Sequence, residues 1–414
     1  MSVLTPKITK CAARQILDSR GMATIEVELQ SMAAGKLEVI TATASVPSGK
    51  STGSEEAFAL RDADGGVTTA IQNIEKIIAP KIIGKDVDAE AVDRIMFALD
   101  ATKNKTNLGA NAMIGVSMAM TRLEAQVKKM PLWKFISAKT GIPAGKPLLY
   151  MNTLNGGAHA DFALPFQEYI VVVGGASLAA SYEKSKIIFE KVREKLNTER
   201  VEYYTGDEGG FAPRFDTLAN TLERPFEVLS GVCAGDKDTF LAIDVAASEF
   251  YKNGKYEVLG KRLGRGELLL SYQPLVEKFN VKSIEDPFDE NDFDGFRQAM
   301  QWYKDSALIV GDDLTVTNSD LIKKYGESGL ANAVIIKPNQ IGTMTETYDA
   351  IRTARRYGWK IIVSHRSGET LDSFIADLAV GVGAYGIKAG AYTQPERVAK
   401  YERLLEIEEE MDKG

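Results

Sequence analysis

Cysteine is scarce in this chain of 414 residues, which has only Cys11 and Cys233. Two cysteines cannot build a disulfide framework, and they match no zinc-ligand spacing, so a reducing compartment is the simpler interpretation. Long apolar runs are also missing, because the longest, near AMIGVSMAM, is interrupted by Ser117. The N-terminus has no apolar core followed by a cleavage site. We therefore expect a soluble, cytoplasmic protein without a membrane partner.

Basic residues are not in excess either. The formal net charge is −7 at pH 7, with 50 lysines and arginines against 57 aspartates and glutamates. No basic stripe is available to displace the counterions of a phosphate backbone, so nucleic acid is not an expected partner. A small acidic substrate would need a local positive site.

The sequence does contain a series of short apolar runs that end on charged residues. Runs of four to six Val, Ile and Leu residues are too short for a helix and too apolar for a half-solvated strand. Each is typical of a strand buried on both faces of a parallel sheet. The runs, with the charged residues that end them, are LAID (Asp244), SIED (Glu285), LIVGDD (Asp312 and Asp313), VIIK (Lys337), IIVSHR (His365 and Arg366) and YGIKAG (Lys388).

The spacing of these run ends predicts a repeating βα unit. The intervals from Asp244 onward are 41, 27, 25, 28 and 23 residues, each long enough for a strand, a crossover helix and two loops. Helical patterns fill the gaps over 294–305, 318–328 and 345–358. Units of this kind can close into a barrel, whose mouth collects the carboxyl ends of the strands. The charged residues would then share one small volume.

The first part of the chain predicts a separate α+β domain. Residues 24–29 alternate between apolar and polar, and residues 37–46 are rich in β-branched side chains. An antiparallel hairpin or meander is therefore expected. Helical patterns follow over 67–82, 88–102 and 108–129, and small residues in the last would let it pack closely on a neighbour. Roughly 250 residues of βα repeat leave room for such a second domain. We expect a cap over residues 1–135 and a barrel over residues 136–414.

The loop VPSGKSTGSEEA imitates a phosphate-binding Walker loop only in its GKST. The motif needs a glycine where this chain has Ala44, and Pro47 lies inside the loop, so nucleotide binding is not expected. Glycines and hydroxyls suit a lid that closes over an anion or supplies oxygen to a hard cation. Taken alone, the loop is by default an ordinary surface turn.

Three carboxylates at strand ends predict a metal site. Asp244, Glu285 and Asp312 offer only oxygen and have no Cys or His neighbour at zinc spacing, which favours Mg²⁺. One such carboxylate alone would more commonly cap the next helix. Three at successive strand ends favour the metal.

Several further residues are candidates for proton transfer and anion binding. A lysine that faces a cation and another lysine can be a neutral base near pH 7, although strand-end lysines more commonly extend into solvent. A histidine alone is more commonly structural, but both histidines of this chain fall in loop-like or strand-end segments. An arginine and a serine in SHRSGET suit a phosphate. The candidates are Lys337, Lys388, Glu208 in GDEGGFAP, His159, Gln167 and Glu168 in NGGAHADFALPFQE, His365, Arg366 and Ser367.

Long motifs throughout the chain resemble the enolase family from residue 14 to the C-terminus. They include ILDSRG, VPSGKSTG, LGANAMIGVSMA, NGGAHAD, FQEY, GDEGGFAP, DVAASEFY, SIEDPFDENDF, VGDDLTVTN, IKPNQIGT, VSHRSGETLDSFIADLAVG and ERVAKYERLLEIEEE. The resemblance implies an α/β fold with a β3α4 cap on a modified TIM-type (β/α)8 barrel whose first units depart from the regular order. It also implies a homodimer or higher homo-oligomer, and the reversible dehydration of 2-phosphoglycerate to phosphoenolpyruvate in glycolysis.

The resemblance also implies residue roles. Asp244, Glu285 and Asp312 resemble the ligands of the tighter Mg²⁺, and Ser51 the contact to a second Mg²⁺ that arrives with substrate. Lys337 matches the base that takes the C2 proton. Glu208 matches the acid that helps the C3 hydroxyl leave, assisted by Glu168 and His159 with Gln167 beside the substrate. Arg366 and Ser367 match the residues that bind the substrate phosphate. Lys388 matches the residue that binds the substrate carboxylate, and His365 matches a nearby supporting group.

The chain departs from the family pattern at Lys50, where the lid commonly has alanine. A cation beside the phosphate would tighten substrate binding, so Lys50→Ala should weaken substrate affinity. Two other functions remain open: a related superfamily enzyme that acts on another acid, and a non-catalytic binding or structural protein. The latter should have lost a proton-transfer group, whereas Lys337 and Glu208 are both present.

Overall fold

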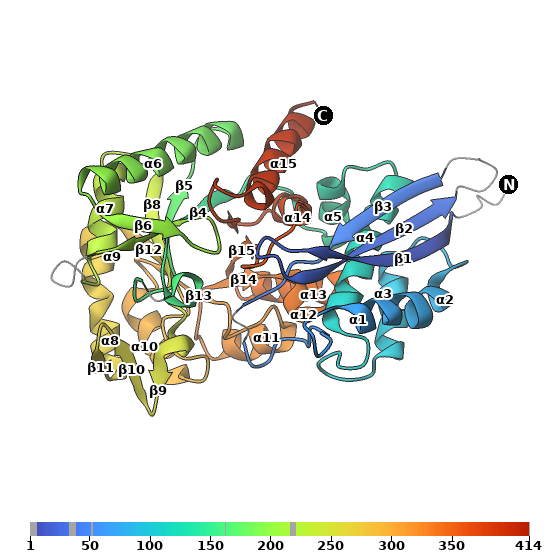
Figure 1. Cartoon of the computed structure of the whole chain (residues 1–414), viewed down its shortest axis with the longest axis horizontal. Coiled ribbons are helices and arrows are strands. Elements are labelled where there is room, and N and C mark those ends of the chain that lie inside the picture. Colours follow the sequence, from blue (N-terminus) through green and yellow to red (C-terminus); the bar gives the residue numbers. More distant parts are fainter. Residues whose placement is uncertain (1–5, 33–38, 51–52, 162, 216–220, 414) are drawn as a thin grey trace.

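Figure 1 shows the fold in a computed structural model, which describes residues 6–32, 39–50, 53–161, 163–215 and 221–413. A small antiparallel sheet with its helices forms one end of the molecule, and the barrel strands with their helices form the other. The expected α/β class with a small N-terminal sheet domain is confirmed.

The cap begins with an antiparallel meander. Its strands are β1 (Lys7–Leu17), β2 (Ala23–Met32) and β3 (Val39–Ser45), in the order β1-β2-β3. The alternation in β2 buries Ile25, Val27 and Leu29, because successive side chains of a strand point to opposite faces. The expected meander is confirmed, although the sequence pattern did not point to β1.

Helices of the cap cover one face of this sheet. They are α1 (Thr68–Asn73), a π-helical turn (Ile74–Ile78), α2 (Ala79–Ile82), α3 (Ala89–Leu99), α4 (Ala110–Val127) and α5 (Leu132–Thr140). The π-helical turn precedes Pro80, which has no N–H to continue the α-helical ladder. Helix α4 packs on β2 and β3, and a Cβ on Gly115 would come within 2.7 Å of Val27 Cγ2. The close packing expected of this helix is therefore present.

Eight strands close the barrel. They are β4 (Leu148–Asn155), β5 (Glu168–Val173), β8 (Thr239–Asp244), β12 (Val281–Glu285), β13 (Leu308–Gly311), β14 (Ala333–Ile336), β15 (Lys360–Ser364) and β16 (Gly386–Lys388). Each pairs with the next in this order, and β16 pairs with β4. Strand β5 is antiparallel to both neighbours, whereas the other barrel pairs are parallel. The first units thus depart from the regular βα order, as expected.

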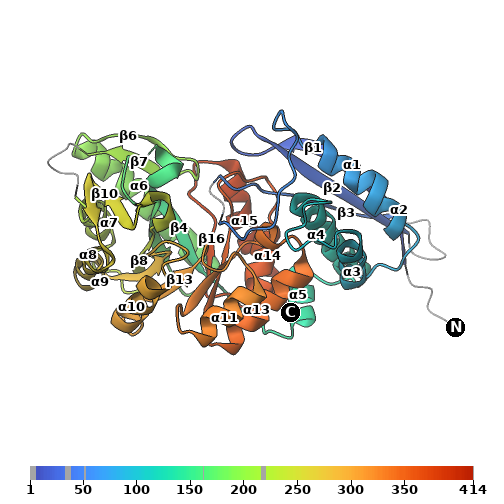
Figure 2. The same cartoon turned by 90° about the horizontal axis from the view of Figure 1, so that it is seen from below.

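Helices cover the outside of the barrel, as seen from below in Figure 2. They are α6 (Leu178–Thr198), α7 (Arg224–Cys233), α8 (Arg265–Ser271), α9 (Gln273–Phe279), α10 (Phe293–Tyr303), α11 (Ser319–Glu327), α13 (Met344–Arg356), α14 (Phe374–Gly381) and α15 (Pro395–Asp412). The short helix α12 (Pro338–Ile341) follows Lys337 and contacts α4 of the cap. In β8, Leu241 and Ile243 belong to the large core cluster, while Ala242 belongs to a second cluster with Tyr150 and Val310. Side chains therefore fill the barrel as a packed core.

Short elements occupy the loops. They are a 3₁₀ turn (Gly157–Ala160), a second 3₁₀ turn (Ala247–Phe250), the hairpin β6 (Glu202–Thr205) and β7 (Phe211–Arg214), and a small sheet of β9 (Tyr251–Lys252), β10 (Lys255–Val258) and β11 (Lys261–Leu263). None of the helices formed by the described residues is long and apolar enough to cross a membrane.

Candidate active site

Strand register brings four charged residues to one end of the barrel. Asp244 and Glu285 end their strands and lie opposite each other, and Lys388 ends β16. Glu168 begins β5 rather than ending it, but β5 is antiparallel, so Glu168 also lies opposite Asp244. All four side chains are buried.

The ammonium group of Lys388 lies among these carboxylates. Its Nζ is 2.9 Å from Glu285 Oε2, 3.1 Å from Glu168 Oε2 and 3.3 Å from Asp244 Oδ2. Burial alone would lower the pKa of Lys388, but Glu168, Glu285 and Asp244 outweigh it and raise that pKa well above its ordinary value. Gln167 Nε2 also donates to Asp244 Oδ2 over 3.3 Å. Lys388 therefore stays charged in this arrangement.

Lys337 and Asp312 form a second group on the neighbouring strands. Lys337 Nζ donates to Asp312 Oδ2, and Gln340 Nε2 donates to Asp312 Oδ1 over 3.0 Å. Burial would lower the pKa of Lys337, but Asp312 reverses this and raises it. This direction is opposite to the one expected for a neutral base, because the sequence could not reveal that Asp312 contacts the lysine directly.

The described residues that can ligate a metal form two clusters of three, one of which is wholly acidic. In one, single ligand atoms of Asp286, Asp312 and Asp313 lie within 4.8 Å of one another. The three predicted metal ligands therefore fall into two groups. Asp244 and Glu285 form ion pairs with Lys388, whereas Asp312 lies beside Asp286. Asp286, which directly follows Glu285, was not among the predicted residues.

The donor chemistry of this end of the barrel fits a hard divalent cation. Burial first, and neighbouring carboxylates second, raise the pKa values of Glu285, Asp286 and Asp313 well above their ordinary range. The carboxylates therefore repel one another, and Lys388 and Lys337 offset this repulsion only in part. An oxygen-only set of this kind suits Mg²⁺.

The second cluster joins His159, Glu168 and Glu208, whose ligand atoms also lie within 4.8 Å of one another. Glu208 Oε2 accepts from Asn152 Nδ2 over 2.5 Å, and Glu208 Oε1 is 3.4 Å from His159 Nδ1. Burial and the charge of Glu208 raise the pKa of Glu168 well above its ordinary value. Burial would also raise the pKa of Glu208, but positive charge holds it well below that value; this charge comes from His365 and His159 when they are protonated, and from Arg397. Because the pKa of Glu168 is raised and that of Glu208 is lowered, a proton shared by the two carboxylates resides on Glu168.

His365 is oriented by an arginine that the sequence analysis did not single out. Arg397 in α15 is fully buried, and its NH1 lies 2.7 Å from His365 Nδ1. A guanidinium can only donate, so Nδ1 accepts and the neutral ring carries its proton on Nε2. Burial lowers the pKa of His365 well below its ordinary value. Nε2 lies 3.6 Å from Glu208 Oε2, so His365 faces Glu208 as a neutral ring.

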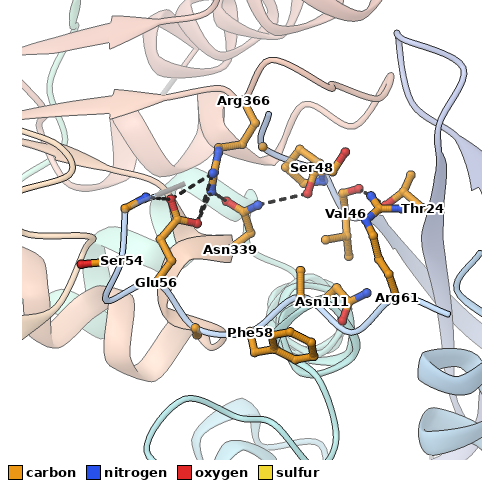
Figure 3. Close-up of a pocket in the computed structure, with 15 residues that line it drawn as sticks. Thr24, Val46, Ser48, Ser54, Glu56, Phe58, Arg61, Asn111, Asn339 and Arg366 are labelled. Atoms are coloured by element: carbon orange, nitrogen blue, oxygen red, sulfur yellow. Dashed lines mark hydrogen bonds and ion pairs between the residues drawn. The ribbon is translucent and has the colours of Figure 1, made fainter. Parts of the chain in front are cut away.

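Arg366 and Ser367 follow β15 and face the segment after β3. Arg366 makes an ion pair with Glu56, and Arg20 NH1 donates to Ser367 Oγ over 3.2 Å. Glu56 and Arg366 line a cavity of about 400 Å³ together with Ser48, Arg61, Asn111 and Asn339, as Figure 3 shows. The predicted metal contact Ser51 lies outside the described residues.

Comparison with known families decides the assignment of the fold. Residues 8–136 match the model of the enolase N-terminal domain, and residues 144–414 match that of the enolase C-terminal TIM barrel domain. The chain belongs to the enolase family. It has enolase function and is a hydro-lyase of glycolysis.

Sequence reasoning missed several residues that contact the predicted site of this enolase. Glu56, Asn152, Gln340 and Arg397 each hydrogen-bond a predicted residue. The only available signal was their presence in or beside the quoted family motifs. Enolases use Mg²⁺ and act on 2-phosphoglycerate, which agrees with the acidic clusters at this end of the barrel.

Proposed function

We propose that the chain reversibly dehydrates 2-phosphoglycerate to phosphoenolpyruvate with Lys337 as the base and the Glu208 and Glu168 pair as the acid. The observation that carries this proposal is the separation of the two groups. Lys337 follows β14, whereas Glu168 begins β5, four strands away in either direction around the ring of eight, and Glu208 from the loop between β6 and β7 lies beside Glu168. The reaction removes a proton at one carbon and a hydroxyl at the next, so a base and an acid must approach from different sides.

We assign Mg²⁺ to Asp244, Glu285 and Asp312, and a second Mg²⁺ that arrives with substrate to Ser51. Bound Mg²⁺ supplies positive charge, which stabilises the anion formed when C2 loses its proton and offsets the charge of Asp312 beside Lys337. Asp312 and Glu285 are the two carboxylates that raise the pKa of Lys337, and both are assigned to the metal. With both engaged, burial and the charges of Arg366 and Lys388 remain, and these lower that pKa. A lysine in that environment can accept a proton.

On the acid side, Glu168 holds the shared proton and Glu208 is ionised. The pair passes this proton to the C3 hydroxyl as it leaves, and the neutral rings of His159 and His365 beside Glu208 assist the transfer. Asn152 holds Glu208 in place through its 2.5 Å hydrogen bond.

Substrate orientation is assigned to the cationic residues. Arg366 offers a planar fork of donors that fits a phosphate, and Ser367 adds a hydroxyl. Lys388 holds the substrate carboxylate, where its positive charge also stabilises the anion formed at C2. Gln167 lies beside the substrate.

The test is Mg²⁺-dependent turnover of 2-phosphoglycerate, followed by the absorbance of phosphoenolpyruvate. We expect Lys337→Ala to lower kcat by about 10²–10⁴, the usual contribution of a positioned general base. Lys282→Ala in β12 is the matched control, because Lys282 is a lysine of the barrel domain that is exposed and contacts none of the described site residues. Chelation of Mg²⁺ should abolish turnover in the parent. Full kcat in Lys337→Ala would refute the assignment of the base.

Three further properties belong to the proposal. We place the end of the cap near residue 135, within α5, and expect a homodimer or higher homo-oligomer, which light scattering would measure. Both cysteines are free thiols, which supports a reducing, cytoplasmic location.

A further inference from the structure

The predicted phosphate holder Arg366 already carries an anionic partner. Its NH2 lies 3.1 Å from both Glu56 Oε1 and Glu56 Oε2, and its NH1 lies 3.2 Å from Glu56 Oε2. The side chains are 4% and 9% exposed, respectively. Figure 3 shows the two facing each other at one side of the cavity. The contact is a buried, fork-shaped ion pair.

This carboxylate contacts the same donors that a phosphate would use. A phosphate and a carboxylate both bind a guanidinium through two parallel N–H···O bonds. The two anions therefore cannot share the same nitrogens of Arg366, and substrate binding must displace or weaken the contact with Glu56.

Glu56 also connects the phosphate holder to the metal and base group. Glu56 Oε1 accepts from Gln340 Nε2 over 3.3 Å, and the same amide donates to Asp312 Oδ1 over 3.0 Å. When Glu56 leaves, this amide loses one of its two acceptors and keeps Asp312. Asp312 in turn contacts Lys337.

The neighbouring cavity can receive the displaced side chain. Asn111 and Arg61 line it and offer an amide and a positive charge to a carboxylate. Glu56 lies in the segment 53–58, and the backbone N–H of Gly53 donates to Glu56 Oε1 over 3.3 Å. A rotation of this side chain within the cavity needs no strand or helix to move.

We infer that Glu56 is a specificity-determining residue, a built-in competitor that substrate phosphate must displace from Arg366. Breaking a buried ion pair is unfavourable unless an equal or greater negative charge replaces the lost partner. A phosphate dianion meets this condition better than the single charge of a carboxylate. The contact with Glu56 therefore selects phosphorylated acids over acids that lack the phosphate. This inference rests on the proposed role of Arg366 in binding the phosphate.

The experiment measures binding of inorganic phosphate to the full chain by calorimetry in the presence of Mg²⁺. Glu56→Gln removes the competing charge and keeps the shape of the side chain, so we expect phosphate to bind at least about tenfold more tightly. Glu55→Gln is the matched control, because it removes the same charge one residue away, where Glu55 pairs with the exposed Lys103. The control should bind phosphate as the parent does.

Three results would overturn the inference or its basis. Equal or weaker phosphate binding by Glu56→Gln would show that Glu56 only positions Arg366. Tighter phosphate binding by Glu55→Gln as well would show that any lost negative charge nearby has this effect, which would overturn the specific role of Glu56. Phosphate binding that survives Arg366→Gln would instead refute the proposed role of Arg366. If Glu56→Gln does not fold, Glu56→Asp supplies the test, because the shorter side chain keeps the charge but weakens the two-pronged contact and should also tighten phosphate binding.

Discussion

At the residue scale, Lys50 illustrates how the structure changes the reason behind a prediction. The sequence suggested that its charge lies beside the substrate phosphate. In the structure, Lys50 Nζ is 2.9 Å from Asp207 Oδ2, and the two side chains are 44% and 27% exposed. Asp207 precedes Glu208, so Lys50 links the segment after β3 to the loop that carries the acid.

Lys50→Ala should therefore raise KM only modestly. An exposed ion pair contributes at most about 1 kcal/mol, which corresponds to a rise in KM of up to about fivefold with kcat nearly unchanged. Lys103→Ala is the control, because Lys103 pairs with Glu55 and is even more exposed. Steady-state kinetics on 2-phosphoglycerate would measure both variants. Parental KM and kcat in Lys50→Ala would exclude a role for this residue.

Residues that end buried strands could be predicted from the sequence, whereas their partners could not. The apolar runs before Asp244, Glu285 and Lys388 form the strands β8, β12 and β16, because such runs leave no exposed face. Glu56 contacts an arginine 310 positions away, and no local pattern marks such a pair. Arg397 lies in a helix whose sequence does not mark the buried face, so its contact with His365 depends on how α15 docks.

At the element scale, the direction of β5 determines the site. The sequence placed Glu168 after a glycine-rich loop but gave no strand direction, since a short apolar run is the same in both directions. The antiparallel pairing with β4 and β8 turns the start of β5 toward the barrel mouth. A regular βα unit would have placed this glutamate at the opposite end of the barrel.

A second feature at this scale is the junction of α3, α4 and α13. Asp93 in α3 is buried, and its Oδ2 accepts from Ser117 Oγ over 3.0 Å, Thr345 N over 3.1 Å and Thr345 Oγ1 over 2.6 Å. Burial raises the pKa of Asp93 from 3.8 to about 6. The carboxylate thus anchors the first turn of α13 to the cap without a cationic partner among its hydrogen-bonding contacts.

This junction should make stability depend on pH. The folded state binds the Asp93 proton more tightly than the unfolded state, so this group favours folding below pH 4 and loses its contribution as pH rises to about 6. A shift of about two units corresponds to about 3 kcal/mol. Asp93→Asn cannot titrate, so its stability relative to the parent should increase by about that amount between pH 4 and pH 7. Denaturant unfolding at several pH values measures this difference, and a flat difference would contradict the prediction.

At the scale of the whole molecule, a largely buried ion pair joins the cap to the barrel, with Arg122 18% and Asp372 8% exposed. Arg122 in α4 donates from NH1 to Asp372 Oδ2 over 2.6 Å and from NH2 to Asp372 Oδ1 over 2.7 Å. Asp372 precedes α14 and also accepts from the backbone N–H of Ser45 at the end of β3. Burial would raise the pKa of Asp372, but Arg122 outweighs it and lowers that pKa. Both the sheet and a helix of the cap therefore meet the barrel at one carboxylate.

Arg122→Met should destabilise the whole chain by about 3–5 kcal/mol, because Asp372 would keep a buried charge without its partner. Since the pKa of Asp372 is lowered in the folded state, this loss is fully present at neutral pH and shrinks as pH falls below its ordinary value. Adding Asp372→Asn to Arg122→Met removes the unpaired charge and should recover part of the stability. Thermal unfolding of the two single variants and the double variant gives the coupling energy. Additive losses would mean that the cap and barrel are held together elsewhere, by the packing of α4 and α5 against α13 and α14.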